Sequence, residues 1–111
     1  MRDDITTISE LKRAILAMVK KKGWGDENGV QNPQHVAMAM TVEMSELLEH
    51  FQWLNADGVE ILLKGGDPER VALIGEEFAD VLMYGFQLAD CLGIDVSHQI
   101  ERKIGIVEKR R

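Results

Sequence analysis

The sequence contains little cysteine, little proline and few aromatic residues. One of its 111 residues is cysteine (Cys91), two are proline, and 5% are aromatic. A lone Cys91 excludes a disulfide framework within the chain and a zinc site built from several thiolates. Runs of hydrophobic residues are also short, and none approaches the ~20 residues of a membrane span. The segment after Met-Arg-Asp-Asp is not apolar, so we expect neither a signal peptide nor membrane attachment.

The sequence also has fewer basic than acidic residues. The chain has 13 Lys and Arg against 19 Asp and Glu, which gives a net charge of −6. This argues against nucleic acid as a partner, because nucleic-acid binding requires a basic surface. With 45% hydrophobic and 29% charged residues, the composition is that of a folded protein and not of a disordered chain. The length fits one domain, residues 1–111, which we expect to be cytoplasmic.

Helix signals divide the chain into four segments. Both prolines follow a residue that can cap a helix, as Asn32-Pro33 and Asp67-Pro68, and proline is well tolerated as the first helical residue. Strands are not expected, because no segment alternates between apolar and polar residues. The expected helices are residues 7–22, 33–54, 68–92 and 95–109, and the loop 56–66 can hold one or two helical turns at 59–64. The sequence therefore predicts an all-α, four-helix bundle with two long central helices.

Two pairs of acidic residues border the apolar faces of these central helices. At about 100° per residue, Glu43 and Glu46 lie along one flank of the apolar stripe of the second helix. On the third helix Glu77 projects within the apolar arc and Asp80 lies at its edge, whereas Glu76 projects to the polar side. This helical-wheel analysis thus predicts four carboxylates that converge near the core.

Carboxylates near a core normally need cationic partners. The two central helices hold a single basic residue, Arg70, besides the titratable His35 and His50. Oxygen ligands without thiolates favour Mg²⁺, or Mn²⁺, over zinc, and we interpret His50 as a neighbour of the ligands or a core residue. The alternative is that both acidic pairs lie on solvated faces of a non-catalytic helical interaction module.

These residues also resemble a known family. Glu43-Met-Ser-Glu46 followed by Glu77-Phe-Ala-Asp80 is similar to the E-x-x-E and E-x-x-D signature of the all-α NTP pyrophosphohydrolases. Phe51-Gln-Trp53 and Asp80-Val-Leu-Met-Tyr84 resemble the short MazG-like, dCTP-pyrophosphatase-like branch. The resemblance spans roughly residues 8–110. It implies a MazG-like bundle and Mg²⁺-dependent hydrolysis of a nucleoside triphosphate to the monophosphate and pyrophosphate. A dCTP-like or non-canonical deoxynucleotide is the implied substrate.

The resemblance also implies residue roles and an assembly. Glu43, Glu46, Glu77 and Asp80 would hold the metal, and a metal-polarised water would attack the α-phosphorus, with Glu46 as the group that orients or deprotonates it. The substrate-binding residues are implied to be Trp24, Trp53, Tyr84 and Lys103. Members work as homodimers or homotetramers. A phosphoribosyl-ATP pyrophosphohydrolase, which belongs to the same superfamily, is an alternative activity.

Overall fold

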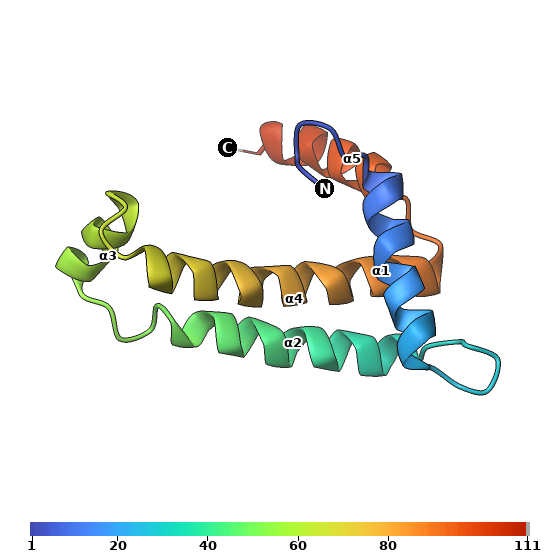
Figure 1. The fold of residues 1–111 in the computed structure, drawn as a ribbon. Helices are drawn as coiled ribbons and strands as arrows, with labels where there is room; N and C mark the ends of the chain where they lie inside the picture. The colour runs from blue at the N-terminus through green and yellow to red at the C-terminus, as the bar shows by residue number, and fades with distance from the viewer. Residues whose placement is uncertain (111) are drawn as a thin grey trace. The chain divides into compact units, whose positions relative to one another are not determined.

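All regular elements of the computed structural model, which describes residues 1–110, are α-helices. They are α1 (Ile8–Lys22), α2 (Pro33–Glu49), α3 (Ala56–Leu63), α4 (Pro68–Leu92) and α5 (Val96–Glu108) (Figure 1). Because no strand occurs among the described residues, the predicted all-α class is confirmed. No helix in this range has the length and apolar character needed to cross a membrane. Arg111, the last residue of the expected domain, lies outside the described residues.

The helix ends follow the capping signals of the sequence. The Thr7 hydroxyl accepts a hydrogen bond from the backbone N–H of Glu10 at 3.1 Å and opens α1. Gly23 ends the same helix in the left-handed conformation, with φ 70°, which glycine adopts without the steric cost of a Cβ. At the start of α5, the Asp95 carboxylate accepts from the backbone N–H of His98 at 2.9 Å.

The second helix is shorter than predicted. We expected it to reach residue 54, but α2 ends at Glu49. The backbone N–H groups of His50 and Phe51 bond to carbonyls three residues earlier, at 3.2 and 2.9 Å, which tightens the turn into 3₁₀ geometry. Asn55 then begins α3 by accepting from the backbone N–H of Gly58 at 2.9 Å. The predicted helical turns at 59–64 are therefore part of a separate eight-residue helix with its own cap.

The described residues form two compact units. Unit 1 combines Met1–Pro33 with the described residues from Phe86 onward, and unit 2 is Gln34–Gly85. In unit 1, Ile15 and Val19 of α1 are buried, as are Phe86 and Ala89 of α4. Whether the chain forms the single domain we expected stays a prediction.

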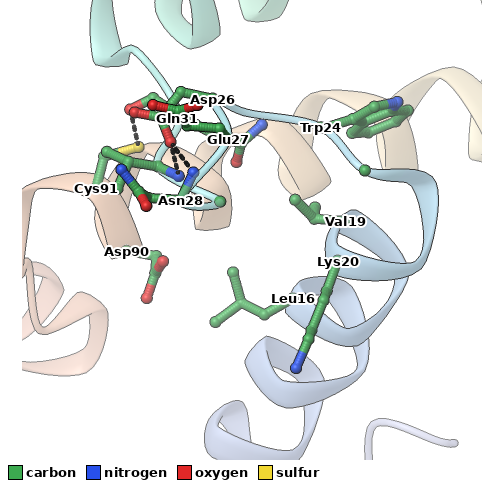
Figure 2. Close-up of a pocket in the computed structure, with 13 residues that line it drawn as sticks. Leu16, Val19, Lys20, Trp24, Asp26, Glu27, Asn28, Gln31, Asp90 and Cys91 are labelled. Atoms are coloured by element: carbon green, nitrogen blue, oxygen red, sulfur yellow. Dashed lines mark hydrogen bonds between the residues drawn. The ribbon is translucent and has the colours of Figure 1, made fainter.

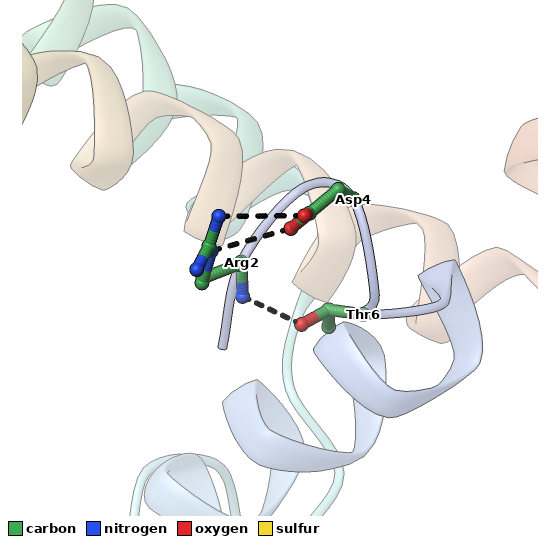
Figure 3. Close-up of polar contacts among 3 residues, drawn as sticks. All are labelled: Arg2, Asp4 and Thr6. Carbon is green, nitrogen blue, oxygen red and sulfur yellow. Dashed lines mark hydrogen bonds and ion pairs between the residues drawn. The ribbon is translucent and has the colours of Figure 1, made fainter.

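The segment before α1 is a closed turn in unit 1. The backbone N–H of Arg2 donates to the Thr6 hydroxyl at 2.9 Å, and the Arg2 side chain pairs with Asp4 at 3.3 Å (Figure 3). Both side chains of the ion pair are largely exposed, and exposed pairs of this kind contribute little to stability. The turn before α1 is thus held by bonds between neighbouring residues, and it contributes no candidate site residue.

Unit 2 is an antiparallel helical hairpin. Within it, α2 and the first part of α4 lie side by side, and α3 lies in the connection between them (Figure 1). Two neighbouring helices cover each other along one face only, so much of the predicted apolar surface stays exposed. Met44 and Phe51 are 46% and 40% exposed, and Phe78 and Leu82 are 53% and 43% exposed. These side chains lie on the apolar stripes of the two helices, so a single chain leaves part of each stripe uncovered.

Candidate metal site

The predicted carboxylates come together between α2 and α4. One oxygen each of Glu43, Glu77 and Asp80 lies within 4.8 Å of the other two. Glu46 stands one turn after Glu43 and interacts with both Glu43 and Glu77. Glu43, Glu46 and Glu77 are half-buried, whereas Glu76 is exposed, as the helical wheel predicts. Residues 34 positions apart in the sequence thus form one acidic cluster.

Two oxygens of this cluster lack a partner. Glu43 Oε2 and Glu77 Oε2 are buried, and neither has a hydrogen-bond partner among the described residues. Leaving a buried carboxylate oxygen without a partner is unfavourable, so such an atom calls for an explanation. A cation held between α2 and α4 would satisfy both oxygens at once.

The raised pKa values of Glu43 and Glu77 also indicate that the cluster is short of positive charge. Burial raises the pKa of Glu43, and the charge and side-chain hydrogen bond of Glu46 raise it further, as do the charges of Asp80 and Glu77. The pKa of Glu77 is raised by burial, then by Glu46 and Asp80, while the nearby His50 opposes the shift. A hydrogen bond between two carboxyl groups requires a proton on one of them. In the absence of a metal, the cluster therefore favours retaining a proton.

The donor set suits a hard divalent cation. All four candidate ligands are carboxylates, which Mg²⁺ and Mn²⁺ prefer. Since Mg²⁺–oxygen bonds measure about 2.1 Å, ligands on opposite sides of the ion lie about 4.2 Å apart. The observed oxygens lie within 4.8 Å of one another, so small side-chain movements suffice to coordinate one ion. The residues present therefore fit the metal that the sequence predicts.

The other predicted site residues lie in different environments. Tyr84 is half-buried on α4, one turn after Asp80. Trp53 follows α2 in unit 2 and is 87% exposed. Trp24 and Lys103 belong to unit 1, where Trp24 is 39% exposed and Lys103 lies beside Ile100 and Ile104 of α5. Their roles in binding stay predictions.

Trp24 borders a cavity in unit 1. The cavity has a volume of about 610 Å³ and is lined by α1, the loop 23–31 and the end of α4. Leu16 and Val19 of α1 form one side, and Asp90 and Cys91 of α4 form another (Figure 2). Burial and the charge of Asp90 raise the pKa of Cys91, so its thiol stays protonated at neutral pH. A volume of this size is within the range of small-molecule pockets.

Hydrogen bonds to backbone N–H groups shape the loop that lines this cavity. Asp26 Oδ1 accepts from the backbone N–H groups of Asn28 and Val30, at 2.8 and 2.9 Å. Gly25 has φ 108°, and a Cβ there would lie 3.0 Å from the backbone carbon of Gly29. Only glycine fits this close approach without strain.

Two further bonds attach the end of this loop to α4. Gln31 Nε2 donates to Oε1 of Gln87 at 3.0 Å, and the Cys91 thiol donates to the Gln31 carbonyl at 3.5 Å. Gln87 is 1% exposed and is the most buried polar side chain described. This attachment was not predicted from the sequence. The available signal was the position of Gln87 two turns after Asp80, a polar residue bordering an apolar arc.

Comparison with known proteins agrees with these features. Residues 38–110 match the MazG-like family, and the chain belongs to this family. Human dCTP pyrophosphatase 1 is 29% identical to the chain over 104 residues. That match covers 94% of the chain but 58% of the human protein, so the chain spans less than two-thirds of this relative's length. No solved structure matches the chain. All four candidate metal ligands lie within the family match, and Trp24 precedes it.

Proposed function

We propose that the protein is a Mg²⁺-dependent nucleoside triphosphate pyrophosphohydrolase. It would convert a nucleoside triphosphate and water into the nucleoside monophosphate and pyrophosphate, with a dCTP-like or non-canonical deoxynucleotide as substrate. The acidic cluster between α2 and α4 carries this proposal, because two of its buried oxygens have no partner among the described residues. Membership of the MazG-like family and the similarity to human dCTP pyrophosphatase 1 support it.

The residues of the cluster divide the chemistry between them. Glu43, Glu77 and Asp80 hold the metal, with Glu46 as a further ligand. Bound Mg²⁺ supplies positive charge that neutralises the phosphate oxygens and acidifies nearby water. Glu46 also orients the attacking water and accepts its proton. The water oxygen forms a bond to the α-phosphorus, the bond from that phosphorus to the bridging oxygen breaks, and pyrophosphate leaves.

Aromatic and basic residues are proposed to bind the rest of the substrate. Trp24, Trp53 and Tyr84 offer flat apolar surfaces on which a nucleobase can stack. The Lys103 ammonium can pair with phosphate oxygens. The exposure of Trp53 and Trp24 supports this assignment, because both rings have surface available for contact.

A homodimer or homotetramer is part of the proposal. Unit 2 exposes large apolar side chains on both of its long helices, which are Met38, Val42, Met44 and Leu48 on α2 and Val71, Leu73, Phe78 and Leu82 on α4. Large apolar side chains exposed together on two neighbouring helices favour association. A second copy would cover it by forming a bundle of four helices from two hairpins. Light scattering at working concentration tests this, and a monomer would contradict it.

A product assay tests the activity. The protein is incubated with each canonical dNTP and NTP, with Mg²⁺ and with EDTA, and the released phosphates are identified. We expect Mg²⁺-dependent release of pyrophosphate and the monophosphate, with no turnover in EDTA. Release of orthophosphate would contradict attack at the α-phosphorus. Absence of turnover, together with no effect of Mg²⁺ on thermal stability, would instead support a non-catalytic interaction module.

A further inference from the structure

Arg70 links the beginning of α4 to the end of α2. Its backbone N–H donates to Asp67 Oδ1 at 3.1 Å, and its Nε pairs with Asp67 Oδ2 at 3.4 Å. Its Nη1 donates to the backbone carbonyl of His50 at 3.1 Å, immediately after the last residue of α2. One guanidinium therefore satisfies a carbonyl at the C-terminal end of α2 and fixes the capping side chain of α4. Cations are favourable at helix C-termini.

The bond from Arg70 to His50 lies equally far along both helices from the facing carboxylates Glu43 and Glu77. His50 follows Glu43 by seven residues, and Arg70 precedes Glu77 by seven residues. Seven residues make about two helical turns, or roughly 10 Å along the axis, and return to the same face of the helix. Because α2 and α4 are antiparallel, placing Arg70 opposite His50 also places Glu43 opposite Glu77.

Repulsion among the carboxylates opposes the alignment of α2 and α4 that brings Glu43 opposite Glu77. Glu43, Glu46, Glu77 and Asp80 repel one another across the two helices, as the causes of the raised pKa values of Glu43 and Glu77 indicate. Among residues 34–85 there are ten acidic residues and two basic ones, Lys64 and Arg70. Lys64 pairs with Glu60 at 2.7 Å within the exposed segment around α3. Arg70 is thus the basic side chain of unit 2 that joins α2 to α4.

We propose that Arg70 is a positioning residue that holds α2 and α4 in the register that brings Glu43 opposite Glu77. It preorganises the metal site on which the proposed function rests. A one-residue slip would move a carboxylate by about 1.5 Å along the axis and turn it by about 100°, so the ligands would no longer converge. A direct contact between Arg70 and substrate phosphate is the weaker interpretation, because Glu49, Asp67 and Glu69 line the same cavity and repel anions.

Replacing Arg70 would change the cation affinity in opposite directions, depending on whether Arg70 acts through its charge or by holding the helices in register. If Arg70 acted only through its positive charge, its removal would make the cluster more negative and tighten cation binding. If Arg70 holds the register, its removal weakens cation binding. Replacement of Lys64 removes the same charge from the same unit without touching the link, and it provides the matched control.

Binding of Mn²⁺ to the full chain without nucleotide tests this, with free Mn²⁺ measured by electron paramagnetic resonance. For Arg70→Met we expect a dissociation constant about 10–100-fold above that of the wild type, as for residues that support metal ligands. Arg70→Lys keeps the charge but not the fork of donors, and we expect weaker binding there too. Lys64→Met should bind as tightly as the wild type or more tightly. In turnover, Arg70→Lys should require more metal for half-maximal rate and keep its kcat at saturating metal.

Three results would overturn the inference or its basis. Wild-type affinity in Arg70→Lys would show that the forked donors of the guanidinium are not needed to position the ligands. Unchanged or tighter binding in a folded Arg70→Met, verified by circular dichroism, would show that the link does not position the ligands. If Arg70→Met does not fold, Arg70→Lys decides. Failure of the wild type itself to bind Mn²⁺ would overturn the proposed metal site, and is thereby distinct from a failure confined to Arg70.

Discussion

Replacement of Glu77 by glutamine separates the folding role of the acidic cluster from its metal-binding role. The change keeps the side-chain shape and removes a carboxylate whose pKa is raised by burial, by Glu46 and by Asp80. Because the folded protein disfavours this charge, Glu77→Gln should raise the melting temperature in EDTA. The same change removes a ligand, so the stabilisation by Mg²⁺ should be largely lost.

The expected size follows from linkage. A ligand at 100 times its dissociation constant stabilises the folded state by about 2.7 kcal/mol. For a chain of this length, 1 kcal/mol corresponds to roughly 4–8 °C, so saturating Mg²⁺ should raise the wild-type melting temperature by roughly 10–20 °C. The exposed neighbour provides the control, and Glu76→Gln should keep the full Mg²⁺ response. The reasoning would be refuted if differential scanning fluorimetry gave both variants the same melting temperatures with and without Mg²⁺.

Other changes give further tests. Because the pKa values of Glu43 and Glu77 lie above the ordinary 4.5, the folded state binds extra protons. Stability in EDTA should therefore be highest below that value and fall as pH rises through the raised pKa values; thermal melts between pH 4 and 8 measure this, and saturating Mg²⁺ should reverse the trend near neutrality. Gln87→Leu removes the acceptor of the bond from Gln31 and should lower the free energy of unfolding by about 1–3 kcal/mol in urea titrations, without changing Mn²⁺ affinity. Cys91 should react with iodoacetamide at pH 7 more slowly than free cysteine, as mass spectrometry can follow, because its pKa is raised; equal rates would contradict this.

The helices and the candidate ligands could be predicted because they depend on local signals. Capping at Thr7 and Asp95 requires only residues within one turn, and the structure shows both caps. The difference between Glu76 and Glu77 follows from the 100° step of a helix, and the burial of the two side chains agrees with it. Helix caps and the face on which a side chain lies can therefore be predicted from the sequence without knowing the tertiary structure.

The features that were missed depend on contacts between distant segments. The bond between Gln31 and Gln87 joins residues 56 positions apart, and the bond from Arg70 to the carbonyl of His50 joins residues 20 positions apart. Helical wheels place a residue on a face but do not show what lies opposite. For the same reason the apolar arc of α4 could be predicted, but not that a single chain leaves Phe78 within it 53% exposed.

The central claim is that the carboxylates between α2 and α4 bind a divalent metal. Anomalous diffraction from crystals of the protein soaked in Mn²⁺ tests it most directly. We expect an anomalous peak within bonding distance, about 2.2 Å, of carboxylate oxygens from Glu43, Glu77 and Asp80. A Mn²⁺ peak only elsewhere on the protein, or no peak at concentrations that saturate the thermal response, would contradict the account.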